Sequence, residues 1–277
     1  RVLIVAAAFQ NAFAQLGLDT PARVRAHFLP GPVPAKTTVI VKPATLVQPD
    51  GSSMEVFYKQ YEYAPPTWRF LGRPSKARCE YDNYGVFMRL KLPCARRVAW
   101  GEERDGWSRL RRAFILTQAI PDAVSLKEFF QASAGLPPSQ RRSLRRTLRN
   151  QLADMTRRIH AANFFHHDLV WRNLLVTWRA PAAPQLWWID CPRGGFVRWS
   201  PGRERRRIKD LASLDKVASQ VCTRTERAAF IRAYLGRPSL DVEARKLIRA
   251  VLAYRRKRWP KDWHETRPAT PPTAGHS

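Results

Sequence analysis

Within residues 1–120, apolar and polar positions form short alternating or continuous runs, which is the pattern of β-strands. Residues 36–41 are rich in β-branched side chains, and residues 54–61 alternate between apolar and polar positions. Pro49-Asp50-Gly51 lies between these runs and is typical of a tight turn. The two runs are therefore predicted to pair as a hairpin. Residues 112–117 form a further apolar run, which indicates a buried strand.

Helical patterns begin in this first part and dominate the chain after Pro121. Ser75 is a favourable N-cap for a helix that follows it. Ser125 and Glu128 have the spacing of a capping box. Residues 139–162 then carry apolar side chains at steps of three and four, which predicts a long helix with one buried face. The side chains of that face are Leu144, Leu148, Leu152, Met155 and Ile159.

The C-terminal part combines one further hairpin with more helices. Asn163 is expected to end the long helix in a left-handed conformation, a role in which Asn follows only Gly. Residues 173–178 and 186–189 are two apolar runs separated by Pro and Ala, which predicts a β-hairpin. Further helices are predicted over residues 209–222, 226–234 and 241–259. The Pro- and Thr-rich tail, residues 266–277, is predicted to be disordered.

Composition and charge narrow the classes of function. The 277 residues, of which 44% are hydrophobic, suffice for a folded core. A surplus of Lys and Arg, 49 against 22 Asp and Glu, gives a net charge of +27, which attracts nucleic acid, an anionic membrane leaflet or a phosphorylated glycolipid. Val2–Phe9 is at the short end for the apolar region of a signal peptide, and no stretch is long enough to cross a bilayer. Any membrane contact is therefore expected to be peripheral.

The residues that carry chemistry lie toward the middle of the chain. Asp168 and Asn173 are five positions apart on a loop predicted between a helix and a strand, and Asp190 directly follows an apolar strand. Phosphoryl transfer from ATP needs a carboxylate that orients the acceptor hydroxyl and takes its proton, and oxygen ligands that hold Mg²⁺ against the phosphates. Asp168 fits the first role, and Asn173 and Asp190 fit the second.

Around these positions the chain resembles the kinase superfamily, and more narrowly the bacterial lipopolysaccharide kinases of the Kdo/WaaP family. The resemblance rests on His-His-Asp-Leu at 166–169 with Asn173, and on Trp-Trp-Ile-Asp-Cys-Pro-Arg-Gly at 187–194. An arginine-rich run and Lys-Asp-Leu-Ala-Ser-Leu at 209–214 complete it. It implies ATP and Mg²⁺ as cofactors.

The resemblance also implies a two-lobed, protein-kinase-like fold of the α+β class. Residues 1–120 would form an N-terminal lobe built on an antiparallel sheet, and residues 121–265 a mostly helical catalytic lobe. Within the N-terminal lobe, Lys59 would contact the ATP phosphates and Glu80 would pair with it. The resemblance further implies that the hinge that meets the adenine consists of Gln118, Ala119 and Ile120.

Other residues are expected to support the catalytic loop or to bind the acceptor. The resemblance implies that Asp210 is a buried brace for the catalytic-loop backbone, and His166 is interpreted as structural support. A basic segment beside the catalytic aspartate suits a substrate that already carries phosphates or carboxylates. The candidates for this contact are Arg172, Arg193, Arg203, Arg205, Arg206 and Arg207.

Two departures from the protein-kinase pattern favour a glycolipid kinase over a protein kinase. No Gly-x-Gly-x-x-Gly loop precedes Lys59, and Asp190 is followed by Cys-Pro where protein kinases have Phe-Gly. The activation switch of protein kinases is therefore not expected here.

These residues predict an ATP-dependent kinase, and the resemblance implies that its acceptor is a heptose or Kdo hydroxyl of the lipopolysaccharide core. It is expected in the cytoplasm, peripherally bound to the anionic cytoplasmic leaflet of the inner membrane, with nucleic acid not expected as a partner. Two alternatives stay open: a small-molecule or protein kinase of the same fold, and an inactive kinase-fold module that binds an anionic membrane or nucleic acid.

Overall fold

The computed structural model describes residues 2–31 and 38–260. Their contacts divide the protein into two compact units. Unit 1 consists of the chain up to Val124 together with Leu175–Trp178 and Leu186–Gly195, and unit 2 consists of Ser125–Leu174, Arg179–Gln185 and the chain from Phe196 onward. The protein has the predicted α+β class, because an antiparallel sheet dominates unit 1 and helices dominate unit 2. The predicted tail over 266–277 lies outside the described residues.

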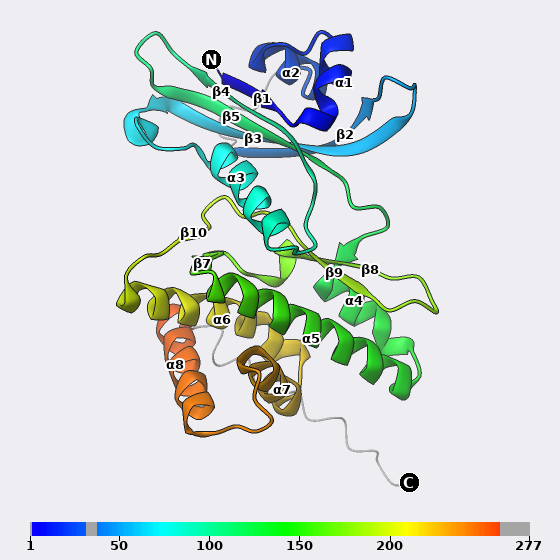
Figure 1. The fold of residues 1–277 in the computed structure, drawn as a ribbon, viewed down its shortest axis with the longest axis vertical. Coiled ribbons are helices and arrows are strands. Elements are labelled where there is room, and N and C mark those ends of the chain that lie inside the picture. The colour runs from blue at the N-terminus through cyan, green and yellow to red at the C-terminus, as the bar shows by residue number, and fades with distance from the viewer. Residues whose placement is uncertain (1, 32–37, 261–277) are drawn as a thin grey trace, which may run out of the picture. The chain divides into compact units, whose positions relative to one another are not determined.

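The sheet of unit 1 has five strands in the order β1-β4-β5-β3-β2, and every neighbouring pair is antiparallel (Figure 1). The predicted first hairpin is confirmed by the pairing of β2 with β3, and the predicted apolar strand is confirmed by β5. Lys36 and Thr37, in the predicted first run, lie outside the described residues. The strands are β1 (Val2–Val5), β2 (Val39–Val47), β3 (Ser53–Thr67), β4 (Arg97–Arg104) and β5 (Leu110–Gln118).

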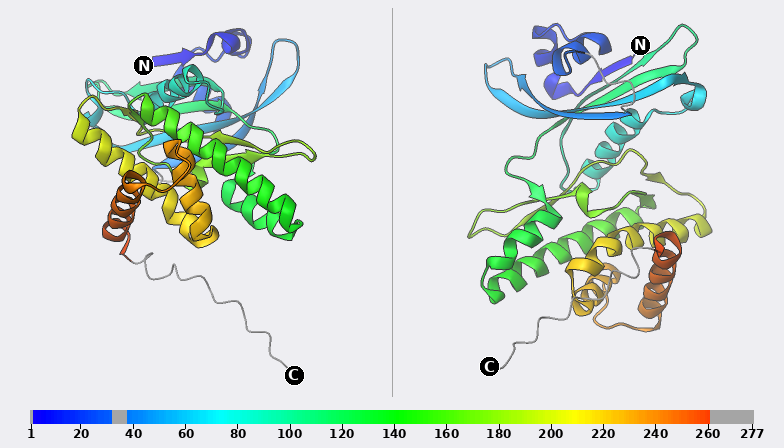
Figure 2. Two further views of the ribbon diagram at one scale, coloured as in Figure 1. Left: turned by 60° about the horizontal axis from the view of Figure 1, so that its bottom comes forward. Right: turned by 180° about the vertical axis from the view of Figure 1, so that it is seen from behind.

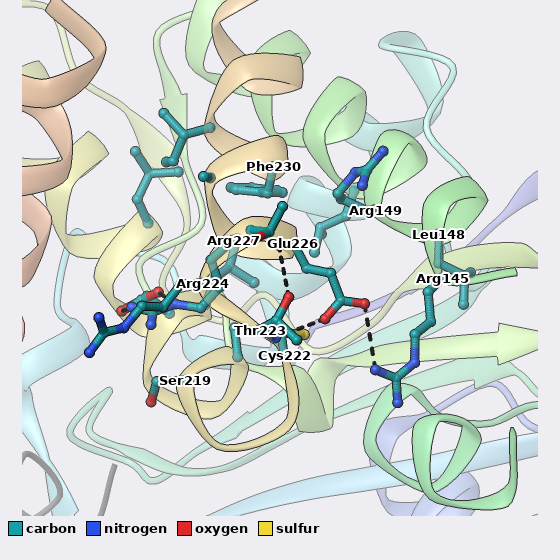
Figure 3. A pocket seen from close by; sticks show the side chains of 18 of the residues that line it. Arg145, Leu148, Arg149, Ser219, Cys222, Thr223, Arg224, Glu226, Arg227 and Phe230 are labelled. Atoms are coloured by element: carbon teal, nitrogen blue, oxygen red, sulfur yellow. Dashed lines mark hydrogen bonds and ion pairs between the residues drawn. The ribbon is translucent and has the colours of Figure 1, made fainter. Parts of the chain in front are cut away.

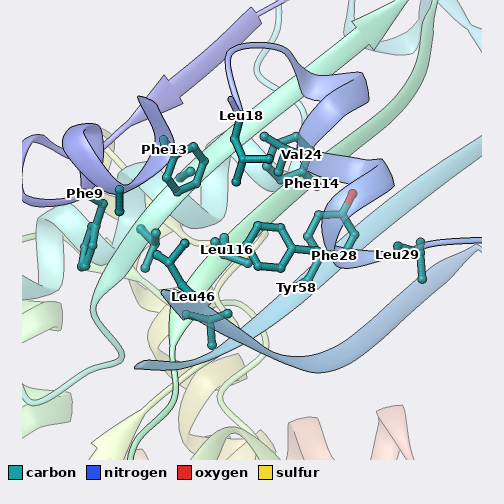
Figure 4. Packing of buried hydrophobic residues seen from close by; sticks show 14 residues of the cluster. Phe9, Phe13, Leu18, Val24, Phe28, Leu29, Leu46, Tyr58, Phe114 and Leu116 are labelled. Atoms are coloured by element: carbon teal, nitrogen blue, oxygen red, sulfur yellow. The ribbon is translucent and has the colours of Figure 1, made fainter. Parts of the chain in front are cut away.

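The core of unit 1 lies between this sheet and the short N-terminal helices η1 (Ala7–Phe9), α1 (Gln10–Gln15) and α2 (Pro21–Phe28). Their aromatic and aliphatic side chains meet inward-facing strand residues, as Figure 4 shows. Tyr58 on β3 stacks on Phe28 and on Phe114, with ring centroids 5.9 and 5.3 Å apart. Because each fully buried apolar side chain contributes about 1.5–3 kcal/mol, this cluster fixes one face of the sheet against the helices.

Helix α3 (Lys76–Arg89) and a small hairpin complete unit 1. The helix predicted after Ser75 is confirmed, since the Ser75 side chain accepts a hydrogen bond from the Arg78 amide at 3.2 Å. The second predicted hairpin is confirmed by β8 (Leu174–Thr177) and β9 (Gln185–Trp188), which pair in a sheet with the two-residue strand β6 (Val124–Ser125). The 3-10 helix η2 (Trp68–Phe70) follows β3.

Unit 2 begins with the predicted capping box and long helix. Ser125 and Glu128 bond reciprocally at the start of α4 (Leu126–Ala132), and α5 (Pro138–Ala161) buries the predicted apolar face. The long helix is followed by Asn163 at a φ of 57°, the predicted left-handed residue. The short elements of this unit are η3 (Ser133–Gly135), β7 (Phe164–Phe165) and η4 (Trp171–Asn173), and β7 pairs with β10 (Gly195–Phe196).

Three helices, α6 (Ser200–Val221), α7 (Arg224–Leu235) and α8 (Val242–Arg258), form the rest of unit 2, and Figure 2 shows them from two further directions. Leu211, Tyr234, Leu247 and Val251 join these helices in one apolar core. The predicted start of α6 at residue 209 is wrong. The helix begins nine residues earlier, at Ser200, because Pro201 suits the first helical turn and the following arginines favour helix over loop.

No helix within residues 2–31 and 38–260 has the length and the apolar composition that a membrane span requires.

Candidate active site

Unit 1 brings Lys59, Glu80 and Asp190 together from three different elements. Lys59 lies on β3, between Val41 of β2 and Ile115 of β5, while Glu80 lies on α3 and Asp190 follows β9. The Lys59 Nζ atom donates to Glu80 Oε2 at 3.0 Å and to Asp190 Oδ1 at 2.5 Å. Three residues singled out from the sequence thus form one ion-pair cluster. Their functional roles stay predictions.

The alternation of side chains along β3 explains why Lys59 is available to α3. Tyr58 points into the core against α2, so its neighbour Lys59 points from the opposite face of the sheet. Glu80 is buried there, and it also accepts a hydrogen bond from the Tyr61 hydroxyl at 2.8 Å. The strand and the helix therefore fix both partners of the pair.

The electrostatics of this cluster depend on the balance between burial and charge. Burial raises the pKa of Glu80, although the Lys59 ammonium group opposes that rise. Burial alone would lower the pKa of Lys59, but the carboxylates of Glu80 and Asp190 outweigh it and raise the pKa. Lys59 is therefore held as a cation, which is the state that contacts with phosphate oxygens require.

Helix α3 also anchors the segment that carries Asp190. The backbone N–H of Asp190 donates to the Tyr84 hydroxyl at 3.0 Å, and Asp190 has a φ of 58°. The Asn83 side-chain amide donates to the carbonyl oxygens of Cys191 at 2.8 Å and Gly194 at 3.0 Å. One helix thus positions both the glutamate and the loop of the predicted metal ligand.

The predicted hinge residues follow the last strand of the sheet. Gln118 ends β5, and its N–H donates to the Arg96 carbonyl at 2.8 Å. The Ala119 N–H donates to the Glu55 carbonyl at 2.9 Å, and the Ile120 carbonyl accepts from the Ala123 amide at 3.3 Å. Gln118 and Ala119 line a cavity of about 670 Å³ in unit 1. Adenine recognition by Gln118 and Ala119 would use atoms other than these two N–H groups.

Unit 2 holds the loop with Asp168 and Asn173. The Asn173 side-chain amide nitrogen donates to the Asp168 carbonyl at 2.9 Å, which ties the two ends of the loop together. The Asp168 side chain is 33% exposed, and its Oδ2 atom accepts from Arg172 at 3.4 Å. The carboxylate is thus accessible to an acceptor hydroxyl, while the backbone beneath it is fixed.

Asp210, on α6, lies fully buried behind this loop. Its carboxylate accepts hydrogen bonds from the backbone N–H groups of His166 at 2.8 Å and His167 at 2.9 Å. Burial would raise its pKa, but hydrogen bonding and charge from His160 and His166 outweigh burial and lower the pKa. His160 in turn contacts the Tyr234 hydroxyl at 2.8 Å. Asp210 therefore stays ionised and holds the backbone that precedes Asp168.

The six predicted acceptor-binding arginines fall into two groups. Arg203 and Arg207 already bond within unit 2, to the Val197 carbonyl at 3.1 Å and the Tyr234 hydroxyl at 2.9 Å respectively. Arg206 lies 3.5 Å from the His167 Nδ1 atom. The other three are exposed to solvent: Arg193, Arg205 and Arg172, of which the last donates to Asp168.

The two predicted metal ligands belong to different units, Asn173 to unit 2 and Asp190 to unit 1. Within residues 2–31 and 38–260, no group of three or more His, Cys, Asp or Glu side chains gathers around a possible ion site. Asn173 and Asp190 offer an amide oxygen and a carboxylate. Each is a ligand type that Mg²⁺ accepts, because this ion keeps several waters and substrate phosphates in its coordination shell and needs few protein ligands.

A second cavity, of about 840 Å³, lies within unit 2. Leucine, isoleucine and phenylalanine side chains from α4 to α8 line its interior, and arginines surround them, as Figure 3 shows in part. Arg145 lies over the Phe130 ring, 4.6 Å from its centroid, and pairs with Glu226 at 3.5 Å. The cavity is therefore apolar within and cationic around its lining.

The fold is similar to that of a kinase of known structure. A solved structure of WaaP in complex with acyl carrier protein is similar to this chain, with a TM-score of 0.68 at 23% sequence identity, and the match covers 95% of this chain and 100% of the other. That likeness shows the WaaP kinase fold. No curated protein matches the chain.

The family follows from the sequence itself. The model of the lipopolysaccharide kinase (Kdo/WaaP) family matches residues 56–234. This range includes the ion-pair cluster of Lys59 and the loop with Asp168 and Asn173. The chain belongs to the lipopolysaccharide kinase (Kdo/WaaP) family. It is a phosphotransferase that acts on a sugar hydroxyl in lipopolysaccharide biosynthesis.

Sequence reasoning missed several residues that hold the clusters in place. Asn83 and Tyr84 anchor the Asp190 segment, and His160 supports Asp210. A signal for the first two was present, because Asn83 and Tyr84 follow Glu80 by three and four residues and so share one face of a helix with it. His160 falls at the end of the predicted long helix, where nothing in the sequence distinguishes it.

Proposed function

We propose that this chain transfers the γ-phosphoryl group of ATP to a hydroxyl of heptose or Kdo in the lipopolysaccharide core. The observation that carries the proposal is the cluster of Lys59, Glu80 and Asp190. A lysine held as a cation between two carboxylates suits a phosphate-binding site, because the ammonium group exchanges one of its carboxylate partners for phosphate oxygens when nucleotide binds. Glu80, the fully buried partner, keeps the lysine in place.

The residues divide the chemistry between them. Asp168 accepts the proton of the sugar hydroxyl as its oxygen forms a bond to the γ-phosphorus, the bond from that phosphorus to the β,γ-bridging oxygen breaks, and ADP leaves. Asn173 and Asp190 would hold Mg²⁺, which neutralises charge on the phosphates when bound. Asp210 keeps the loop backbone in the conformation that presents Asp168.

The charge of the protein favours an anionic acceptor at a membrane. The net charge is +27, and Arg172, Arg193 and Arg205 are exposed. Guanidinium groups bind phosphate and carboxylate in a bidentate manner, which suits an acceptor that carries either group. We therefore place the reaction at the cytoplasmic face of the inner membrane, with the enzyme bound peripherally.

Purified protein, ATP and Mg²⁺ incubated with core oligosaccharide test the proposal. Mass spectrometry should show the gain of one phosphate on heptose or Kdo, and Asp168→Asn should slow the transfer by about 10²–10⁴-fold, the usual contribution of a general base. Asp154→Asn, which changes a carboxylate that is 44% exposed on α5, is the matched control and should retain activity. Unchanged core oligosaccharide from cells that lack the gene would contradict the proposed acceptor.

The same assay separates the alternatives. Phosphate transfer to a soluble sugar or a protein, with none to core oligosaccharide, would identify a kinase with another acceptor. If ATP with Mg²⁺ neither stabilises the protein against heat nor is consumed, the inactive binding module becomes the better description.

The cavity of unit 2 suggests a partner for the enzyme, because the similar WaaP structure is a complex with acyl carrier protein. We propose that this chain also binds an acyl carrier protein, and that the acyl chain enters the apolar cavity of about 840 Å³. An acyl chain needs an apolar tunnel, and the arginines around the cavity suit an acidic carrier.

Filling the cavity tests this partner. Ala218→Phe places a ring among the lining residues of α6 and should abolish co-elution with the acylated carrier. The matched control is Ala26→Phe, which places the same ring at an exposed position of α2 and should leave co-elution unchanged. Equal binding of acylated and unacylated carrier would show that the acyl chain is not recognised.

A further inference from the structure

Two loops of unit 1 expose large apolar side chains at one end of the sheet. Trp68 and Leu71, in and directly after η2, are 53% and 57% exposed. Trp107, in the turn between β4 and β5, is 74% exposed. None of these three side chains contributes to the core of unit 1.

Strand pairing and hydrogen bonds hold the two loops side by side. Thr67, which precedes η2, pairs with Leu110 at the start of β5. Arg104 bridges the loops, because its Nη2 atom donates to the Phe70 carbonyl at 3.4 Å and its Nη1 atom to the Ser108 carbonyl at 3.1 Å. We refer to Trp68, Arg69, Leu71, Arg73 and Trp107 as the tryptophan surface.

Contacts within unit 1 hold the conformation of both loops. Phe70 packs edge-to-face against Tyr63, with ring centroids 5.1 Å apart, and this contact fixes η2. In the other loop, Asp105 Oδ1 accepts from the backbone N–H groups of Trp107 and Arg109, each at 3.0 Å. Such preorganised loops present their side chains with little loss of conformational entropy on binding.

The charge around these side chains is positive. Glu102 is paired with Arg104 at 2.9 Å, and Asp105 with Arg109 at 2.7 Å, so these acids are neutralised within the loops. Arg69 and Arg73 are exposed, and neither forms an ion pair with an acid in the part of the chain that the structure describes. The tryptophan surface therefore combines apolar rings with a net positive charge.

We propose that the tryptophan surface docks the protein on an anionic phospholipid leaflet. The two indole rings and Leu71 enter the boundary between headgroups and acyl chains, and Arg69 and Arg73 contact the lipid phosphates. Tryptophan prefers this boundary because its ring is apolar and its N–H is polar. A second copy of the chain fits poorly, since two cationic surfaces repel. The inference deepens the proposed function, because it names the part of the enzyme that contacts the membrane.

Vesicle sedimentation tests the surface. Vesicles of phosphatidylcholine with phosphatidylglycerol should bind the wild-type protein, and the double variant Trp68→Ser/Trp107→Ser should bind them about tenfold or more weakly. The matched control is Met88→Ser/Val242→Ser, which removes two exposed apolar side chains from α3 and α8 and should bind as the wild type does. Equal vesicle binding by the tryptophan variant, or no binding by the wild type, overturns the proposal.

A soluble acceptor separates this proposal from the proposed reaction. The tryptophan variant should phosphorylate delipidated core oligosaccharide at the wild-type rate but lose rate when the acceptor is embedded in anionic vesicles. An equal loss of rate on both acceptors would assign the side chains to the fold and overturn the docking role. If the wild type phosphorylates neither acceptor yet binds vesicles through the two tryptophans, the proposed reaction fails and the surface stands.

Discussion

Asp210 is the residue on which the loop with Asp168 and Asn173 depends. It is 0% exposed, and both of its carboxylate oxygens accept backbone N–H groups. A buried polar group of this kind stabilises the fold chiefly because its loss would leave the donors without acceptors.

Replacement of this carboxylate should therefore cost stability and activity together. Asp210→Ala leaves the N–H groups of His166 and His167 buried and unsatisfied, and we expect the free energy of unfolding to fall by about 2–5 kcal/mol. Urea denaturation followed by fluorescence measures the change. Asp154→Ala, at a half-exposed carboxylate that pairs with Arg157, should change stability by less than about 1 kcal/mol. Similar losses for the two variants would refute the special role of Asp210.

His167 makes the stability of the folded protein depend on pH. Burial, followed by the nearby Arg206 and Lys209 charges, lowers its pKa to about 4 against the attraction of Asp210. As the pH falls below the ordinary histidine pKa of about 6.5, His167 binds a proton in the unfolded chain. In the folded protein it stays neutral until the pH nears about 4. Stability should therefore fall across this window.

Thermal melts between pH 7 and pH 4.5 measure this effect. His167→Gln should show a smaller loss of Tm over that range than the wild type, because the unfolded variant has one fewer group to protonate. His27→Gln, at an exposed position of α2, should keep the wild-type dependence. Parallel curves for all three proteins would show that other groups control the acid response.

At the scale of elements, α3 links stability to the candidate active site. It carries Glu80 and the two side chains that anchor the Asp190 segment, Asn83 and Tyr84. Its start depends on Ser75, whose side chain caps the Arg78 amide. A change at the cap therefore affects three residues that lie further along the helix.

Removal of that cap should reduce both stability and catalysis. Ser75→Ala should lower the free energy of unfolding by about 1 kcal/mol, the usual value of an N-cap, and should also lower kcat through a looser Glu80. Thr20→Ala removes the equivalent cap of α2, where the Thr20 hydroxyl accepts from Arg23 at 3.3 Å. That control should lose similar stability with unchanged kcat. An equal drop of kcat in both variants would mean that the cap of α3 affects catalysis no more than the cap of α2 does.

The elements that the sequence predicts are those with a clear period or a clear boundary residue. The β2–β3 hairpin, α3, α4 and α5 all have such a period or boundary residue. The spacing of Asp168, Asn173 and Asp190 singles these residues out in the same way, without a tertiary contact. The pattern does not predict β4, because Gly101 and the buried Glu102 interrupt its apolar run. Gly101 is needed there, since a Cβ atom would lie 2.5 Å from the Phe114 ring.

The short N-terminal elements escape prediction for a different reason. Helices α1 and α2 have 6 and 8 residues, too few to show a period, although Thr20-Pro21 is a recognisable helix start. Strand β1 becomes a strand only through its pairing with β4, a contact distant in sequence. The side chains that support the site, such as Asn83 and His160, depend on tertiary contacts in the same way.

At the scale of the whole molecule, the charge of +27 opposes folding as well as attracting anions. Like charges lie closer together in the folded protein than in the expanded chain, so their repulsion destabilises the folded state. Salt screens such repulsion over about 10 Å at 0.1 M ionic strength. We therefore expect the Tm to rise between about 20 mM and about 300 mM sodium chloride. Salt also weakens individual ion pairs, but this loss of stability is smaller than the gain from screened repulsion.

A variant with reversed charges isolates this effect. Arg111, Lys127, Lys246 and Arg249 are exposed and lie outside both clusters, and their replacement by Glu lowers the positive charge without touching the core. The Tm of this variant should respond less to sodium chloride than that of the wild type. Sulfate should raise the wild-type Tm more than chloride does at equal ionic strength, because sulfate occupies the arginine-rich sites. If the variant and the wild type respond equally to chloride, net repulsion is not what limits the stability of this protein.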